Sequence, residues 1–386
     1  MGFYHELPQL HHEAQLAFEL SSPDRMGFND FGGNEYQCAL QVLAKSLDAA
    51  DDLSPLTAQI MRANIIDVLQ SRLCSQFYFH QNPSCINVEI RRPIFIIGMP
   101  RSGTTALHRL LAADNCNQGL EYWLGVSPQP RPNKKEWPGM IEFQQCDEKL
   151  TYMQQAAPSL KEIHDMAANQ VDECRLLLMQ SFMNVTFQSA AWVGDYEQWL
   201  LKADFTEAYS RYKMNLQLIS GGDERRWVLK DPSHLWAPDA LLTTFPDACI
   251  VQMHRDPCEL IPSVANLVYT TRRMVEPGID KHRVGRRELA QWSSLLDNLE
   301  TFRRNHSATR VYDVSMQQLQ HNPATVVKNI YRHFSLDSGR ASLDDDVEKM
   351  VAGIQHEDRH AIRSHRYTAE EFGLTNEQIE RAFNTH

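Results

Sequence analysis

Residues 92–107 read Arg-Pro-Ile-Phe-Ile-Ile-Gly-Met-Pro-Arg-Ser-Gly-Thr-Thr-Ala-Leu, and this stretch decides the fold. An apolar, β-rich run predicts a strand over 93–98, and a helical pattern follows from Ala106 to Ala113. Between them lies a loop of Gly, Ser and Thr. A strand, such a loop and a helix in this order are typical of phosphate-binding loops, where backbone N–H groups and the helix dipole both favour an anion. The sequence therefore predicts an α/β fold with an anion site after this strand.

The loop departs from the pattern of ATP-binding loops. Residues 98–105 read G-x-x-x-x-G-T-T, whereas ATP-binding loops read G-x-x-x-x-G-K-[ST]. Thr104 stands where a lysine would reach the β- and γ-phosphates, and Arg101 is the only cation in the loop. The chain keeps a phosphate cradle and lacks the standard hold on a triphosphate.

Composition narrows the classes of protein. The chain has 386 residues, of which 42% are hydrophobic and 23% are charged, as in ordinary globular proteins. Its formal net charge of -11 argues against a nucleic-acid partner. An anionic ligand then needs local cations, and Arg101, Lys230 and Arg255 are the candidates.

The cysteines and the N-terminus indicate a compartment. The eight cysteines include no Cys-x-x-Cys pair, so we expect no structural zinc site and a reducing, cytoplasmic location. The first residues, Met-Gly-Phe-Tyr-His-Glu-Leu-Pro, lack the basic and apolar regions of a signal peptide. No apolar run approaches the roughly 20 residues of a membrane span.

We expect an N-terminal extension followed by one α/β domain. Residues 1–90 are predicted to be mostly helical, with a helix over 55–79 that Asn82-Pro83 ends. This extension is expected to pack on the core; a dimer interface or a substrate lid are its alternative roles. Residues 91–386 form the α/β domain, with a helical insertion over about 140–220.

Further strands alternate with helices after the first loop. We expect strands over 226–230, 248–254 and 309–314, and helices over 235–244, 257–275, 286–305 and 323–334. This alternation predicts a central parallel sheet with helices on both faces.

Two intervening segments have distinctive compositions. Residues 127–138 carry four prolines and must be irregular. The helical insertion carries large apolar side chains that either line an apolar acceptor pocket or form plain helix core. These side chains are Met179, Phe182, Met183, Phe187 and Trp192.

Two motifs, about 150 residues apart, resemble those of one enzyme family. Pro-Arg-Ser-Gly-Thr-Thr after the first strand resembles the 5′-phosphosulfate loop of sulfotransferases, which use 3′-phosphoadenosine 5′-phosphosulfate (PAPS). Residues 248–268 resemble the family's strand-and-helix element for the 3′-phosphate, with Arg255 and Ser263 at its phosphate-binding positions. The resemblance covers roughly residues 92–375 and is closest to the bacterial-type, small-molecule branch. It implies the P-loop-like sulfotransferase fold.

The resemblance also implies which residues bind the donor. Arg101 would hold the 5′-phosphate and the bridging oxygen, since a guanidinium matches phosphate geometry. The other loop residues expected to line the donor site are Pro100, Ser102, Gly103, Thr104 and Thr105. Arg255 follows a strand, where ligands bind in open α/β sheets, and Ser263 lies two helical turns further on. Pro262, just before Ser263, predicts a kink.

A third strand end carries groups for chemistry. Residues 227–235, Trp-Val-Leu-Lys-Asp-Pro-Ser-His-Leu, resemble the family's strand that brings a cation and a base to the reacting oxygen. Lys230 would stabilise charge on the leaving group. His234 is the preferred general base, because an imidazole with a pKa of about 6.5 suits neutral pH. Glu173, one of two adjacent acids before an apolar helix, is the rival base, and His254 is a third candidate with a structural role as its alternative.

Two basic regions complete the candidate site. Residues 358–367 resemble the family's terminal His-Arg-Tyr region, in which Arg363 and Arg366 would either fold over the 3′-phosphate or face solvent. A basic run over 272–287 either binds an anionic acceptor or forms a solvated face.

The sequence thus predicts a metal-independent sulfotransferase that uses PAPS and a small, apolar hydroxyl acceptor. A homodimer is one expected assembly, since the family includes monomers and dimers. One rival is a kinase or NTPase with a degenerate loop, which would bind ATP with Mg²⁺. The other is an inactive protein that binds adenosine 3′,5′-bisphosphate (PAP) without turnover.

Overall fold

The computed structural model describes residues 2–50, 52–156, 166–276, 278–307, 310–337, 343–358 and 367–384. The chain divides into two compact units. The first unit holds Met1–Ile90, Leu120–Glu224 and Thr271–Pro277, and the second holds Arg91–Gly119, Arg225–Thr270 and Gly278–His386. The expected domain boundary at residue 90 and the insertion over 140–220 stay predictions.

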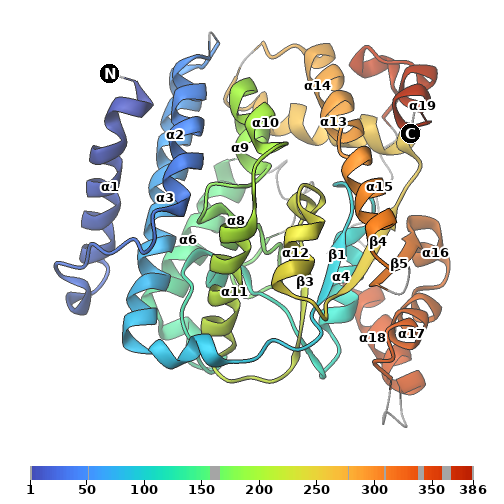
Figure 1. Cartoon of the computed structure of the whole chain (residues 1–386), viewed down its shortest axis with the longest axis horizontal. Helices are drawn as coiled ribbons and strands as arrows, with labels where there is room; N and C mark the ends of the chain where they lie inside the picture. The colour runs from blue at the N-terminus through green and yellow to red at the C-terminus, as the bar shows by residue number, and fades with distance from the viewer. Residues whose placement is uncertain are drawn as a thin grey trace. The chain divides into compact units, whose positions relative to one another are not determined.

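Five strands form the sheet of the second unit (Figure 1). They are β1 (Ile94–Ile97), β2 (Asn117–Gln118), β3 (Arg226–Lys230), β4 (Cys249–His254) and β5 (Val311–Ser315). Their order is β2-β3-β1-β4-β5, so β1 lies between β3 and β4 at the centre. All four pairings are parallel, which confirms the predicted central parallel sheet.

The central strand β1 is apolar because it is covered on both faces. All four of its residues are fully buried, as expected for a strand inside a parallel sheet. Ile94 is in register with Val228 of β3 on one side and with Cys249 of β4 on the other. Since parallel strands end at the same edge, the segments that follow β1, β3 and β4 meet at the carboxyl edge of the sheet.

Helices make up most of the rest of the second unit. The α-helices are α4 (Thr104–Ala112), α12 (Pro238–Thr244), α13 (Pro257–Arg272), α14 (Lys281–Ser293), α15 (Leu296–Asn305), α16 (Met316–His321), α17 (Pro323–His333), α18 (Leu343–Asp358) and α19 (Asn376–Asn384). The short 3₁₀ helices η4 (Pro232–Leu235) and η6 (Glu370–Phe372) also belong to the described part of this unit.

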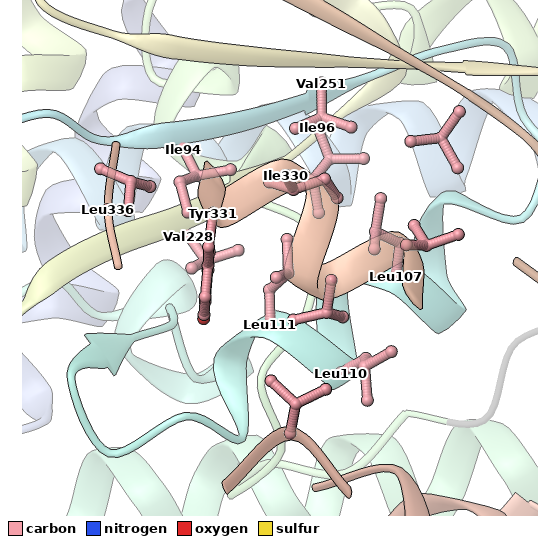
Figure 2. Close-up of a cluster of buried hydrophobic side chains, with 14 of the residues drawn as sticks. Ile94, Ile96, Leu107, Leu110, Leu111, Val228, Val251, Ile330, Tyr331 and Leu336 are labelled. Atoms are coloured by element: carbon pink, nitrogen blue, oxygen red, sulfur yellow. The ribbon is translucent and has the colours of Figure 1, made fainter. Parts of the chain in front are cut away.

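The core of this unit joins the sheet to α4 and α17. Figure 2 shows Ile94 and Ile96 of β1 in one cluster with Leu107 and Leu111 of α4 and with Ile330 of α17. All five side chains are fully buried. Burying each such side chain stabilises the fold by about 1.5–3 kcal/mol, so this cluster holds the loop helix firmly against the sheet.

A hydrogen-bonded tyrosine adds to this core. The buried hydroxyl of Tyr331 in α17 donates to Asp114 Oδ2 at 2.6 Å and accepts from Asn117 Nδ2 at 3.0 Å. Asn117 also donates to the carbonyl oxygen of Leu111 at 2.8 Å. These bonds tie α17 to the end of α4 and to β2.

The first unit is helical in the residues that the structure describes. Its elements are α1 (Phe3–Leu20), η1 (Pro23–Arg25), α2 (Glu35–Asp48), α3 (Pro55–Gln81), η2 (Pro83–Asn87), α5 (Tyr122–Val126), η3 (Trp137–Gly139), α6 (Ile141–Ala156), α8 (Arg175–Met179), α9 (Thr186–Ala190), α10 (Gly194–Leu200) and α11 (Thr206–Ser220). Ser54 caps α3 by accepting a hydrogen bond from the N–H of Thr57 at 3.0 Å, and Pro55 is the first helical residue. The predicted helix over 55–79 is confirmed with two more residues at its end.

Some local predictions differ from the structure. The strand β2 was not expected, because two residues with polar side chains carry no apolar run. The single helix expected over 286–305 is two helices, α14 and α15, separated at Ser294-Leu295. The helix expected over 235–244 begins instead as η4, and Pro238 opens α12.

The proline-rich segment after α5 is irregular over most of its length. Residues 127–136 contain neither helix nor strand, as the prolines predict, but the last two residues of the segment expected to be irregular, Trp137 and Pro138, belong to η3. Among the described helices, none has the length and apolar composition needed to cross a bilayer.

Candidate active site

Positive φ angles shape the loop between β1 and α4. Gly98, Arg101 and Gly103 have φ of 152°, 70° and 91°. A Cβ atom on Gly98 would lie 3.0 Å from the carbonyl oxygen of Met253, so a glycine is needed both for its conformation and for this close approach. The turn places the first N–H groups of α4 at the carboxyl edge of the sheet.

The other predicted loop residues follow the same turn. Ser102 Oγ donates to the carbonyl oxygen of Met99 at 2.7 Å, which closes the turn. Pro100 lies within it, and Thr104 and Thr105 are the first two residues of α4. The first N–H groups of a helix have no acceptor within the helix, so this end suits an anion.

The structure brings the two phosphate motifs together. Arg101 Nε donates to Ser263 Oγ at 3.3 Å, and Arg255 Nη1 donates to the carbonyl oxygen of Arg101 at 3.0 Å. The helix α13 continues through Pro262, and the hydroxyl of Ser263 still reaches the loop. Residues more than 150 positions apart in the sequence therefore share one edge of the sheet.

Two guanidinium groups lie close together at this edge. Arg101 remains accessible to solvent, but partial burial, together with the positive charge of Arg255, lowers the pKa of its guanidinium. An arginine remains protonated at neutral pH in spite of such a shift. A bound anion would offset both the repulsion and the lost hydration.

Lys230 brings a third cation to the loop. It ends β3, beside β1, and only 1% of its surface is exposed. Its Nζ donates to Thr105 Oγ1 at 3.1 Å, at the start of α4. The register of two neighbouring strands thus places the ammonium group at the phosphate-binding loop.

His234 differs from the sequence prediction. It lies in η4, is fully buried, and packs edge-on against Phe95 with ring centroids 5.1 Å apart. Burial lowers the pKa of His234 to about 3. The expectation of an ordinary imidazole pKa is therefore wrong, because burial disfavours the charged ring.

The other two candidate bases each contact a charged side chain. Glu173 precedes α8 in the first unit, and its Oε2 lies 2.9 Å from Arg175 Nη1. His254 Nε2 lies 2.5 Å from Asp313 Oδ1 on β5, and Arg303 Nη1 donates to Asp313 Oδ2 at 3.0 Å. His254 therefore joins the ends of β4 and β5, which favours its structural role.

Most contacts of the basic run over 272–287 are internal to the protein. Arg272 is 2% exposed, and its Nη2 lies 2.6 Å from Glu276 Oε2 in the first unit. Lys281 Nζ lies 3.0 Å from Glu371 Oε2 in the second unit. These pairs favour packing and solvated-face roles over an anionic acceptor site.

The predicted acceptor-pocket side chains lie in the first unit. Met179, Phe182, Met183 and Phe187 are all buried, and Phe182 stacks on Phe187 with centroids 5.7 Å apart. Trp192 is partly exposed, and its indole N–H donates to Glu276 at 3.0 Å. The first four side chains pack as helix core, so a lining role for them stays a prediction.

Two further site predictions have no structural outcome. Arg363 and Arg366 lie outside the described residues, so their role at the 3′-phosphate stays a prediction. No group of three or more His, Cys, Asp or Glu side chains that could hold a metal ion occurs within the described parts of the chain.

Sequence reasoning missed one residue at this edge. Glu259, in the first turn of α13, accepts hydrogen bonds from Nε and Nη2 of Arg255 at 3.3 and 3.2 Å. Arg255 lies two residues before α13, so spacing along one helix does not reveal this pair, and only the positions of the Arg255 donors in the structure single out Glu259.

The sheet and its loop define an α/β protein with a phosphate-binding type of loop after its central strand. A family model described as "Sulfotransferase family" matches residues 93–339. The chain belongs to the sulfotransferase family, which confirms the predicted family and argues against the rival kinase.

Two solved sulfotransferase structures resemble the whole chain. Sulfotransferase STF1 of Mycobacterium tuberculosis H37Rv is 34% identical, with a TM-score of 0.86 and 98% of both chains covered. Sulfotransferase STF9 of Mycobacterium avium is 22% identical, with a TM-score of 0.85 and coverage of 98% of this chain and 95% of that one, so it is similar in fold.

Curated relatives match a shorter part. The omega-hydroxy-beta-dihydromenaquinone-9 sulfotransferases Stf3 of Mycobacterium tuberculosis and Mycobacterium bovis are each 24% identical over 253 residues. This match covers 63% of the present chain and 63% of the length of these relatives.

Proposed function

We propose that this protein transfers the sulfuryl group of PAPS to a hydroxyl group of an apolar acceptor. A bond forms between the acceptor oxygen and sulfur as the bond from sulfur to the 5′-phosphate oxygen breaks. The phosphate keeps the electron pair and leaves as PAP, and the hydroxyl proton passes to a base. Such an in-line transfer needs fixed reactants and cations on the oxygens that gain charge.

The observation that carries the proposal is the convergence of cations at one edge of the sheet. Arg101, Lys230 and Arg255 follow or end the three neighbouring strands β1, β3 and β4. Hydrogen bonds link them to the loop: Lys230 to Thr105, Arg255 to the Arg101 carbonyl, and Arg101 to Ser263. In a chain of net charge -11, this local cluster supplies what a polyanionic nucleotide requires.

Each cation has a distinct proposed role. Arg101 holds the 5′-phosphate and bridging oxygen, and Lys230 stabilises charge that develops on the leaving phosphate. Arg255 and Ser263 hold the 3′-phosphate. Arginine suits the two phosphate roles because its planar donors match phosphate oxygens in pairs.

We propose that the transfer needs no metal ion. The sulfuryl group carries less charge than a phosphoryl group, so the cations of the protein suffice to stabilise the transition state. Turnover that is unchanged by a chelator is the expected result, and loss of turnover that Mg²⁺ restores would contradict it.

Glu173 and His234 are the two proposed proton acceptors. A pKa of about 3 makes His234 a weak base at neutral pH. Glu173 carries a carboxylate in an ion pair with Arg175. We expect the variant that lacks the base to lose turnover while PAP affinity is retained in both Glu173→Gln and His234→Gln, as measured by initial rates and calorimetry. A larger loss in Glu173→Gln would assign the base to Glu173. The reverse order of rates would assign the base to His234.

The proposed acceptor is a hydroxyl on a lipid-like molecule. The curated relatives carry the name of a sulfotransferase for a hydroxylated dihydromenaquinone. The side chains predicted to line an acceptor pocket in the first unit are apolar, which fits an acceptor of this kind; they are Met179, Phe182, Met183 and Phe187. A screen with [³⁵S]PAPS should therefore begin with hydroxylated isoprenoid quinones and long-chain alcohols, and include amines and sugars as contrasts.

The first experiment is a thermal-shift titration with PAP, and separately with ATP and Mg²⁺, on the wild type and on Arg255→Ala. A ligand at a hundred times its Kd should stabilise the protein by about 2.7 kcal/mol. We expect PAP to raise the Tm of the wild type and Arg255→Ala to remove this rise. Stabilisation by ATP with Mg²⁺ alone would overturn the proposal. Stabilisation by PAP without turnover on any acceptor would instead support an inactive PAP-binding protein.

A further inference from the structure

The guanidinium of Arg255 already has oxygen partners on two sides. Its Nη1 donates to the Arg101 carbonyl oxygen at 3.0 Å, and its Nε and Nη2 both donate to Glu259 Oε2 at 3.3 and 3.2 Å. An arginine side chain has five N–H groups, so these contacts use three of them. A phosphate bound to the other two would lie beside a carboxylate.

The exposure of this pair argues against a mainly stabilising role for Glu259. Its side chain is 63% exposed, and that of Arg255 is 21% exposed. An ion pair that solvent reaches, as it reaches the Glu259 side of this one, contributes little to stability. The negative charge of Glu259 should instead affect ligand binding, because only the guanidinium group of Arg255 separates it from the place where a doubly charged phosphate would bind.

We propose that Glu259 is a positioning residue that weakens the hold of Arg255 on the 3′-phosphate and thereby speeds the release of PAP. This inference rests on the proposed function, which assigns the 3′-phosphate to Arg255. Donor and product both carry that phosphate, so tight binding of one brings slow release of the other. A carboxylate on the same guanidinium lowers the affinity for both and raises the dissociation rate of PAP.

The test separates the 3′-phosphate from the rest of the nucleotide. Isothermal titration calorimetry measures the Kd of PAP and of adenosine 5′-phosphate, which lacks only the 3′-phosphate, for the wild type and Glu259→Gln. Glutamine keeps an acceptor oxygen and removes the charge. We expect the Kd of PAP to fall about fivefold and that of adenosine 5′-phosphate to change less than twofold. Stopped-flow displacement should show slower PAP release.

The matched control is Glu348→Gln. Glu348 lies on α18, pairs with Lys328 at 3.1 Å, and has a side chain that is also 63% exposed. This variant removes the same charge from the same unit, and we expect no change in either Kd. Melting curves for both variants check that the fold is intact.

The outcomes separate the role of Glu259 from the assignment of Arg255 to the 3′-phosphate. An unchanged or higher Kd of PAP in Glu259→Gln overturns the role of Glu259, as does an equal fall for both nucleotides, which indicates a general charge effect or a helix-dipole effect on α13. The variant Arg255→Ala separates the two proposals. If Arg255→Ala binds PAP normally, the assignment of the 3′-phosphate fails and the inference fails with it. If Arg255→Ala binds PAP weakly and Glu259→Gln is unchanged, only the inference fails.

Discussion

Two arginines stand at opposite ends of β1, and both have left-handed backbone conformations. Arg92 precedes the strand with φ of 48°, and Arg101 follows it with φ of 70°. A non-glycine residue in this region is strained by about 1–2 kcal/mol. Backbone strain alone therefore does not distinguish the end of β1 that only supports the fold from the end that carries the proposed site.

The partners of the two side chains do tell them apart. The guanidinium of Arg92 donates to the carbonyl oxygens of Phe334 and Ser335, and its backbone N–H donates to Asp247 Oδ2 at 2.7 Å. Arg101 instead meets a hydroxyl group and lies beside a second arginine. The side chain of Arg92 thus donates to carbonyl oxygens of the protein backbone, whereas the neighbouring positive charges of Arg101 and Arg255 favour a bound anion.

A cavity of about 290 Å³ beside Arg92 differs from the carboxyl edge in the same way, through the partners of its arginines. Another arginine lines it, Arg310, whose Nη1 donates to the carbonyl oxygen of Pro246. Both arginines of this cavity, Arg92 and Arg310, thus donate hydrogen bonds to backbone carbonyl oxygens. A basic cavity at the amino edge of the sheet is part of the packing, while the cations of the carboxyl edge carry the proposed chemistry.

The largest expected effect tests the carboxyl end. Arg101→Ala should lower kcat/KM by about 100- to 1000-fold, equivalent to about 2.7–4 kcal/mol of transition-state stabilisation, because it removes a cation from the transferring group. Urea unfolding should show little loss of stability. Near-normal turnover in this variant would remove Arg101 from the mechanism and make the two ends of β1 alike.

The amino end should give the opposite result. Arg92→Ala should lower the free energy of unfolding by about 1–2 kcal/mol, since two carbonyl groups lose their charged donor. PAP affinity should stay the same. The variant Arg92→Gly serves as the matched control: it removes the same bonds but relieves the positive φ, so it should be more stable than Arg92→Ala by about 1 kcal/mol. Weakened PAP binding in either variant would contradict the division of roles.

The smallest effect concerns pH at the carboxyl edge. Although burial opposes it, hydrogen bonds from His254 and Arg303 lower the pKa of Asp313 from 3.8 to about 2. A lowered folded-state pKa means that the stability is present above pH 4 and is lost as the pH falls through about 2. Because the carboxylate is half exposed, solvent screening reduces the effect to about 1 kcal/mol.

Unfolding of the wild type and of Asp313→Asn at pH 6 and near pH 2 measures this contribution. The wild type should lose about 1 kcal/mol more than the variant over that range. If the free energy of unfolding changes equally with pH in the two proteins, the contacts of the Asp313 carboxylate contribute nothing to stability.

The sequence predicted the sheet well because its signals are local. Four of the five strands are short runs rich in apolar residues, and the candidate cations end or follow three of them. The family resemblance implied that Arg101, Arg255 and Ser263 bind one donor, and the rule that parallel strands end at the same edge explains why Arg101 and Arg255 meet. The strand β2 was missed because its pairing with β3 depends on the neighbouring strand and not on its own residues.

Burial and pairing were beyond the reach of the sequence. Nothing in residues 227–235 indicates that His234 packs against Phe95 and loses its ordinary pKa, since that contact joins segments far apart in the chain. Glu259 was overlooked for a different reason. An acid in the first turn of a helix is common, and only the positions of the Arg255 donors single this one out.

The strand order has a consequence for how the chain folds as it is made. β1 lies at the centre of the sheet, yet Ile94 pairs with Val228, roughly 130 residues later, and with Cys249 after that. At a synthesis rate of about 5–20 residues per second, this apolar strand waits on the order of ten seconds for its first partner. Pairing over such distances is slow and leaves nascent chains prone to aggregate. The central position that buries every residue of β1 in the finished protein therefore leaves this apolar strand exposed to aggregation while the chain is being made.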